Sequence, residues 1–256
     1  MAAVTQVWEP NNAYRRLGYS SLPVADSTVF LPFVMTRLSN GWGAAIWIQN
    51  TYEYYQTTIT VDFYNDTQSA PITTTNLTVN GLGLATLNLR TNDYGLGWGW
   101  FGSARIRSNT SAPLAVVVNQ FNDGSNLGAS YEGIPASRGT MKAVLPYVVR
   151  RYNTCYISNY TVRNQGSTDA TMVIHYYRED GTLAPNSGST PTETVKSHKI
   201  YNLYNSTPPI SHTFPADGFR GSVAITSTNN QPIAVSSNLL NYCGGSDAIS
   251  YTGINR

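Results

Sequence analysis

The feature that most constrains this chain is an internal repeat with a unit of about 110 residues. Because several phrases recur in the same order, the two copies are expected to share one fold and to bury separate cores. Each copy ends with nearly the same motif, SYEGI at 130–134 and SYTGI at 250–254. The other matched phrases are LPFV at 31–34 with LPYV at 145–148, IWIQN at 46–50 with YTVRN at 160–164, VDFY at 61–64 with IHYY at 174–177, GSARIRS at 102–108 with GSVAITS at 221–227, and PLAVVVN at 113–119 with PIAVSSN at 232–238.

Each copy consists of short alternating segments separated by clusters of Gly, Asn, Asp and Pro. In the segment 58–64, Ile59, Val61 and Phe63 fall on one face of a strand, whereas Asp62 falls on the other, water-facing side. Roughly seven such segments in a unit of this size are typical of an immunoglobulin-like sandwich. We therefore predict an all-β chain of two tandem immunoglobulin-like β-sandwich domains.

The repeat also sets the expected boundaries: an N-terminal extension at 1–27, a first β-sandwich at 28–135, a linker at 136–143 and a second β-sandwich at 144–256. The extension has no counterpart in the second copy. It either packs on its own domain or acts as an extended arm, a donor strand or clamp that pairs with the sheet edge of another subunit. Its candidate subunit contacts are Val4, Val7, Trp8, Tyr14, Leu17 and Tyr19.

Charge is sparse in this sequence, with 12% charged residues and a net charge of +2. Nucleic-acid binding needs Lys and Arg clustered on one face, and the sequence has no such cluster, so nucleic acid is excluded as a partner. No apolar run is long enough for a membrane span, so membrane insertion is not expected. A surface of Tyr, Asn, Thr and Ser with few charges is common outside cells and predicts an extracellular or cell-surface location.

The chain has two cysteines, Cys155 and Cys243, both in the second copy. They show no metal-binding spacing, so a single disulfide is the expected use. A disulfide that closes the loop between these two cysteines adds roughly 4 kcal/mol to the unfolding free energy by the chain-entropy model.

Catalytic patterns are missing from the sequence. His175 falls on a strand position that Asp62 occupies in the first copy, which predicts a polar outward residue. The stretch 97–102 fits G-x-G-x-x-G in letters, but a strand and not a helix follows it, so it predicts a turn. We expect no catalytic, metal or cofactor site and no enzymatic activity.

Aromatic residues offer the one alternative for ligand binding, because exposed rings can stack on sugars. Trp47 and Trp98 align with Thr161 and Asp217 of the second copy, so neither ring is needed for the fold. The candidate ligand or contact surface is Trp47, Trp98, Tyr52, Tyr54 and Tyr55.

The order of these phrases resembles repeated immunoglobulin-like modules in secreted surface proteins of bacteria, over nearly all of 30–256. The resemblance implies an adhesive or structural role, and related sandwiches build filaments by strand exchange between subunits. It transfers no functional residue.

These observations predict a structural subunit of an extracellular assembly, either a filament or a surface layer, whose main partner is another copy of itself. A carbohydrate-binding or adhesive module, with glycans or a cell surface as partner, is the first alternative. The second alternative is a virion surface or decoration protein.

Overall fold

The structure is a computed structural model, and it describes residues 4–8, 16–20, 25–65, 68–125, 127–184, 192–195, 200–202, 215–241, 243 and 248–255. These residues form antiparallel strands, with one short 3-10 helix, η1 (Ala136–Arg138). The predicted all-β sandwich class is confirmed. The chain divides into two compact units, Met1–Arg138 and Gly139–Arg256.

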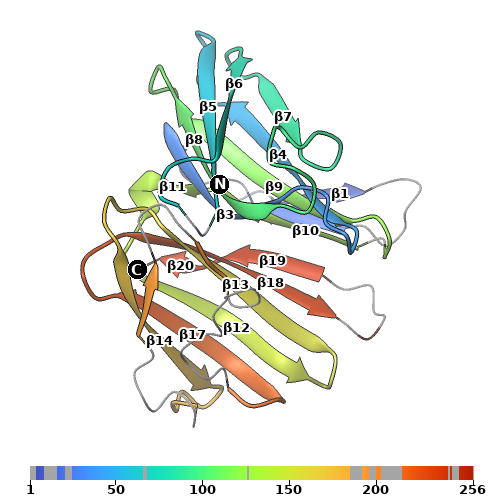
Figure 1. The fold of residues 1–256 in the computed structure, drawn as a ribbon, viewed down its shortest axis with the longest axis vertical. Coiled ribbons are helices and arrows are strands. Elements are labelled where there is room, and N and C mark those ends of the chain that lie inside the picture. Colours follow the sequence, from blue (N-terminus) through green and yellow to red (C-terminus); the bar gives the residue numbers. More distant parts are fainter. Residues whose placement is uncertain are drawn as a thin grey trace. The chain divides into compact units, whose positions relative to one another are not determined.

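The first unit, blue to green in Figure 1, contains two main sheets. One has the order β10-β9-β4-β7 and the other β11-β3-β8-β5-β6. Their inner faces enclose an apolar core that includes Leu31, Ile46 and Ile106. The strands are β3 (Thr28–Met35), β4 (Trp42–Asn50), β5 (Thr57–Tyr64), β6 (Thr73–Val79), β7 (Leu84–Asn88), β8 (Phe101–Ser108), β9 (Leu114–Asn122), β10 (Leu127–Glu132) and β11 (Ile134–Pro135).

The second unit repeats this strand order. β19-β18-β13 with β16 corresponds to β10-β9-β4-β7, and β20-β12-β17-β14-β15 corresponds to β11-β3-β8-β5-β6. Because β12 pairs with both β17 and β13, the two layers join into one nine-stranded sheet. The strands are β12 (Lys142–Tyr152), β13 (Tyr156–Asn164), β14 (Ala170–Arg178), β15 (Thr192–Val195), β16 (Ile200–Asn202), β17 (Phe219–Ser227), β18 (Ile233–Asn241), β19 (Ala248–Thr252) and β20 (Ile254–Asn255).

The S-Y-x-G-I motif at the end of each copy contacts the LP-aromatic-V motif at its beginning. In the first unit β3 bulges between Leu31 and Val34, and the hydroxyl of Tyr131 donates a hydrogen bond to the Phe33 carbonyl inside that bulge. In the second unit, the Tyr251 hydroxyl donates to the Tyr147 carbonyl in the corresponding bulge of β12. The repeated LP-aromatic-V and S-Y-x-G-I phrases are therefore two halves of one contact.

The glycine of the repeated G-S phrase is required by close backbone approach. A Cβ on Gly102 would lie 2.1 Å from the Tyr64 carbonyl oxygen, and one on Gly221 would lie 2.0 Å from that of Tyr177. No side chain fits at such distances, which explains why both copies have glycine here.

The N-terminal extension forms a two-stranded antiparallel hairpin of β1 (Val4–Trp8) and β2 (Arg16–Ser20). β2 lies beside β10 of the same unit. Val4, Val7 and Trp8 belong to β1 and Leu17 and Tyr19 to β2, whereas Tyr14 lies outside the described residues. Exchange of this arm between subunits remains a prediction.

Candidate interaction surface

The five aromatic residues singled out in the sequence do not share one surface. Trp98 is exposed in the turn before β8, where the Gly99 amide donates to the Arg37 carbonyl beyond the end of β3. The three tyrosines lie in the turn that follows β4, at its opposite end. The nine residues of β4 separate these ends by roughly 26 Å at 3.3 Å per residue. Trp98 therefore does not belong with Tyr52, Tyr54 and Tyr55.

The tyrosine turn is anchored by a buried asparagine at the end of β4. The Asn50 side chain accepts a hydrogen bond from the Tyr52 amide at 3.0 Å and donates one to the Tyr55 carbonyl at 3.0 Å. The Tyr52 ring lies 5.5 Å from the Tyr54 ring and 4.3 Å from the Tyr55 ring. Three rings thus form a fixed cluster, in which the Tyr54 side chain is 77% exposed.

The turn between β6 and β7 packs against this cluster. The Leu82 amide donates to the Tyr52 carbonyl at 3.0 Å, and a Cβ on Gly81 would lie only 2.4 Å from the Glu53 carbonyl oxygen. Leu82 has a φ of 56°, in the left-handed region that costs a leucine about 1 kcal/mol or more. Its side chain is nevertheless exposed, so core packing does not account for this backbone conformation.

β7 is the outermost strand beside this turn and pairs only with β4 among the described strands. Leu84 and Thr86 are exposed on its outer face, opposite Gln49 and Trp47 of β4 respectively. Leu84 and Trp47 are therefore diagonal neighbours, within reach of each other's side chains. We call the resulting exposed apolar surface the β7 rim; it comprises Trp47, Tyr54, Tyr55, Leu82 and Leu84.

Charged side chains gather instead on the other sheet, around Asp62 of β5. Asp62 accepts hydrogen bonds from Arg105 and Arg107 at 2.9 Å and from Thr74 at 2.9 Å. Burial opposes the charge of Asp62, but these hydrogen bonds outweigh it and lower the pKa of the carboxyl below its ordinary value. The sequence predicted that Asp62 faces water, but the residue is buried, because the two arginine side chains cover it.

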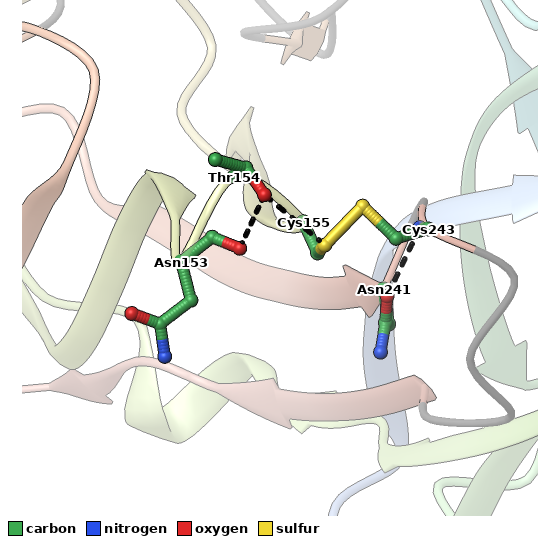
Figure 2. Close-up of a disulfide and its surroundings, with 5 residues drawn as sticks. All are labelled: Asn153, Thr154, Cys155, Asn241 and Cys243. Carbon is green, nitrogen blue, oxygen red and sulfur yellow. Dashed lines mark hydrogen bonds between the residues drawn. A yellow bond between two sulfur atoms is a disulfide. The ribbon is translucent and has the colours of Figure 1, made fainter.

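The predicted disulfide is present, with the Cα atoms of Cys155 and Cys243 5.1 Å apart. Figure 2 shows the bond between Cys155, in the turn before β13, and Cys243, in the segment after β18. The first pair of the β13–β18 ladder, Tyr156 with Asn241, lies next to it in the sequence. The Cys243 amide also donates to the Asn241 side chain at 3.1 Å. The bond fastens the end of the β13–β18 ladder.

Within the described residues, no group of three or more His, Cys, Asp and Glu side chains is placed to hold a metal ion. Over the same residues, no helix is long and apolar enough to cross a membrane. The stretch 97–102 is a turn that enters β8, as predicted, with positive φ at Gly97 and Gly99.

Comparisons with known proteins found no matching family model and no matching curated protein. Among solved structures, Thermotoga maritima 1070 is 18% identical, covers 44% of this chain and 97% of its own, and has a TM-score of 0.35. The PBSX exported protein XepA is 10% identical, covers 94% of this chain and 86% of its own, and has a TM-score of 0.24. Because both TM-scores are below 0.5, neither similarity assigns a function.

Sequence reasoning found Trp47 and the tyrosines but missed Leu82 and Leu84. The signal was present, since NGLGL at 80–84 places Leu82 in a turn of Asn and Gly and Leu84 directly after it. This signal was not decisive, because the alternation of apolar and polar residues at 84–88 fits any half-buried strand. Only the sheet order shows that this strand, β7, lies at an edge.

Proposed function

We propose that this chain is a non-catalytic structural subunit of an extracellular assembly, in which copies associate through the β7 rim. The observation that supports this is an exposed edge strand, β7, that carries no charge, proline or bulge. Natural edges are guarded by charges, prolines or bulges, and residues 84–88 (LATLN) contain no charge or proline and pair with β4 without a register shift.

The occupant of this edge is a second copy of the same strand. When one strand pairs antiparallel with itself about a two-fold axis, the residue on the axis faces its own counterpart and the flanking residues face each other in reverse order, so a charge on the axis would repel its copy and a flanking charge would lie opposite an uncharged residue. β7 carries none. A register centred on Thr86 places Thr86 of one copy opposite Thr86 of the other, which is a favourable cross-strand pair.

Two further features fit this role. Stable disulfides such as Cys155–Cys243 form mainly in proteins of oxidising compartments, which supports an extracellular location. The antiparallel sheets of each unit support the proposal that the sandwiches are immunoglobulin-like modules of the kind found in bacterial surface proteins.

Contact through β7 alone closes a pair, so a longer polymer needs a second contact. Exchange of the β1–β2 arm onto β10 of a neighbouring copy would supply it.

Sedimentation velocity over a range of concentrations tests the β7 contact. Leu84→Lys places a lysine of each copy at the paired edge, opposite Asn88 of the other copy, where it loses water without gaining an anionic partner, and we expect it to weaken association at least tenfold. Leu183→Lys is the matched control, because Leu183 is equally exposed but belongs to the second unit. A wild-type chain that stays monomeric throughout, or a Leu84→Lys variant that associates like wild type, overturns the proposal.

Negative-stain electron microscopy tests the arm. Deletion of residues 1–27 should leave pairs and abolish filaments or sheets. A deletion variant that still forms long assemblies shows that the arm does not connect the subunits.

A further inference from the structure

The second unit contains a polar pocket on the side where β12 bulges. Its volume is about 190 Å³, and it is open to solvent. The lining comes from three strands or their ends, namely β12, β14 and β17, and consists of Pro146, Tyr147, Arg178, Glu179, Arg220, Gly221 and Ser222. Nothing in the proposed assembly uses this site.

The bulge of β12 shapes the pocket. The register between β12 and β17 shifts between Leu145 and Val148, so Pro146 and Tyr147 together lie opposite the single residue Ser222 and form a bulge with one extra residue. The Tyr251 hydroxyl binds the Tyr147 carbonyl and fixes this backbone. Bulges of this kind re-aim side chains beside functional sites.

The corresponding positions of the first unit carry different side chains. Phe33 and Phe101 occupy the places of Tyr147 and Arg220, and their rings lie 6.2 Å apart. Asn65 occupies the place of Arg178. Where the first unit has two phenylalanines and an asparagine, the second unit therefore has a tyrosine and two guanidinium groups.

One of these guanidinium groups is held rigidly. Nη2 of Arg220 lies 2.7 Å from the Glu179 carboxylate, and Nη1 donates to the Tyr152 hydroxyl at 2.9 Å. The guanidinium also stacks over the Tyr152 ring, 4.9 Å from its centroid. The Glu179 carboxylate raises the pKa of Arg220 above its ordinary value, so this group keeps its charge.

The other guanidinium is available to a ligand. Arg178 is exposed and lines the pocket, and its charge acts electrostatically on the nearby carboxylate of Asp180, which is itself exposed. Its backbone is fixed, because its amide donates to the Thr182 carbonyl at 2.8 Å and its carbonyl accepts from Gly181 at 2.9 Å. The pocket thus combines an anchored cation, a solvent-exposed cation and a carboxylate acceptor.

We propose that this pocket binds a single acidic sugar residue, one that carries a uronate carboxylate or a sulfate ester. Arg178 would pair with the acidic group, for which the guanidinium fork is suited. Glu179 keeps lone pairs that accept sugar hydroxyls, and the half-exposed ring of Tyr147 offers a face for the pyranose. Glu179 also disfavours a ligand of high negative charge, which selects a singly acidic sugar over a polyphosphate.

The test is an NMR titration of the full disulfide-bonded chain at constant ionic strength, with D-glucuronate, glucose 6-sulfate, glucose and inorganic sulfate as separate probes. We expect saturable shifts at the amides of Arg178 and Ser222 with the two acidic sugars. Their relative affinities distinguish a carboxylate ligand from a sulfate ligand.

The variants use the residues of the first copy. Arg178→Asn should weaken binding at least tenfold, since a charge-assisted hydrogen bond is lost. Tyr147→Phe with Arg220→Phe should abolish it by restoring the aromatic pair. Arg151→Asn is the control, because Arg151 pairs with Asp217 outside the pocket. Equal response to glucose, sulfate binding as tight as the sugars, or undiminished binding by Arg178→Asn would each overturn the proposal.

Discussion

The repeated tyrosine contact leads to a prediction in which one unit serves as the reference for the other. Tyr131 is 2% exposed, and its hydroxyl satisfies the carbonyl of the buried residue Phe33. Tyr131→Phe removes the donor and leaves that carbonyl buried without a partner, which costs about 1–3 kcal/mol of unfolding free energy. Tyr147 is 39% exposed, so water can replace the Tyr251 hydroxyl, and Tyr251→Phe should cost only about 0.5 kcal/mol.

Urea unfolding followed by tryptophan fluorescence measures the first variant. All five tryptophans lie at or before Trp100, so the signal follows the first unit alone. With a urea slope of roughly 2 kcal/mol per molar, the expected midpoint shift for Tyr131→Phe is about 1 M. Hydrogen exchange of β12 and β18 peptides measures Tyr251→Phe. A Tyr131→Phe loss below about 0.5 kcal/mol, or equal losses in the two units, refutes the reasoning.

The same contact predicts an alkaline pH dependence. Burial raises the pKa of Tyr131, so the folded state keeps the proton when an unfolded tyrosine would ionise near pH 10. The stability from this group is therefore present below about pH 10 and is lost as the pH rises further. Tyr131→Phe should lose less stability than wild type between about pH 9 and 11.

Three other predictions concern the fold of each unit. Gly221→Ala places a Cβ 2.0 Å from the Tyr177 carbonyl oxygen and should speed hydrogen exchange in β17, with a loss of about 2 kcal/mol or more; unchanged exchange would contradict the close approach. Cys155→Ser with Cys243→Ser should lower the stability of the second unit by about 2–5 kcal/mol and leave the tryptophan-monitored transition in place. Because the pKa of Asp62 is lowered, its ion pairs stabilise the first unit above about pH 4, and this stabilisation is lost as the pH falls further. Asp62→Asn should therefore reduce the loss of stability at acid pH, measured by tryptophan fluorescence. An unchanged acid dependence would contradict this.

Much of the fold could be predicted because its signals are local and occur twice. Ile59, Val61 and Phe63 are all fully buried on one face of β5, as the period of two predicts. The disulfide followed from the lack of any other use for Cys155 and Cys243. The matched motifs fall on matched strands, so the repeat implied that the two units share one strand order, although it did not give that order.

The candidate surface was only partly predictable. Comparison of the copies predicted that the fold does not need the Trp47 and Trp98 rings, and both side chains are exposed, yet the comparison gave no distance between them. They lie on different elements of the first unit, one on β4 and one in the turn before β8, and only the strand register shows this. Asp62 illustrates the same limit, because its burial depends on Arg105 and Arg107 from a strand more than forty residues away.

The sequence by itself determined the all-β class, the repeated unit, the inward face of each strand and the disulfide, since periodicity and repetition are properties of the chain. The tertiary structure alone decided that β7 is an edge and that the bulge of β12 opens a pocket beside Arg178 and Arg220. The physical reason is that an edge or a pocket is defined by what does not lie next to a residue. That depends on the order and register of every strand in the sheet, which no local pattern contains.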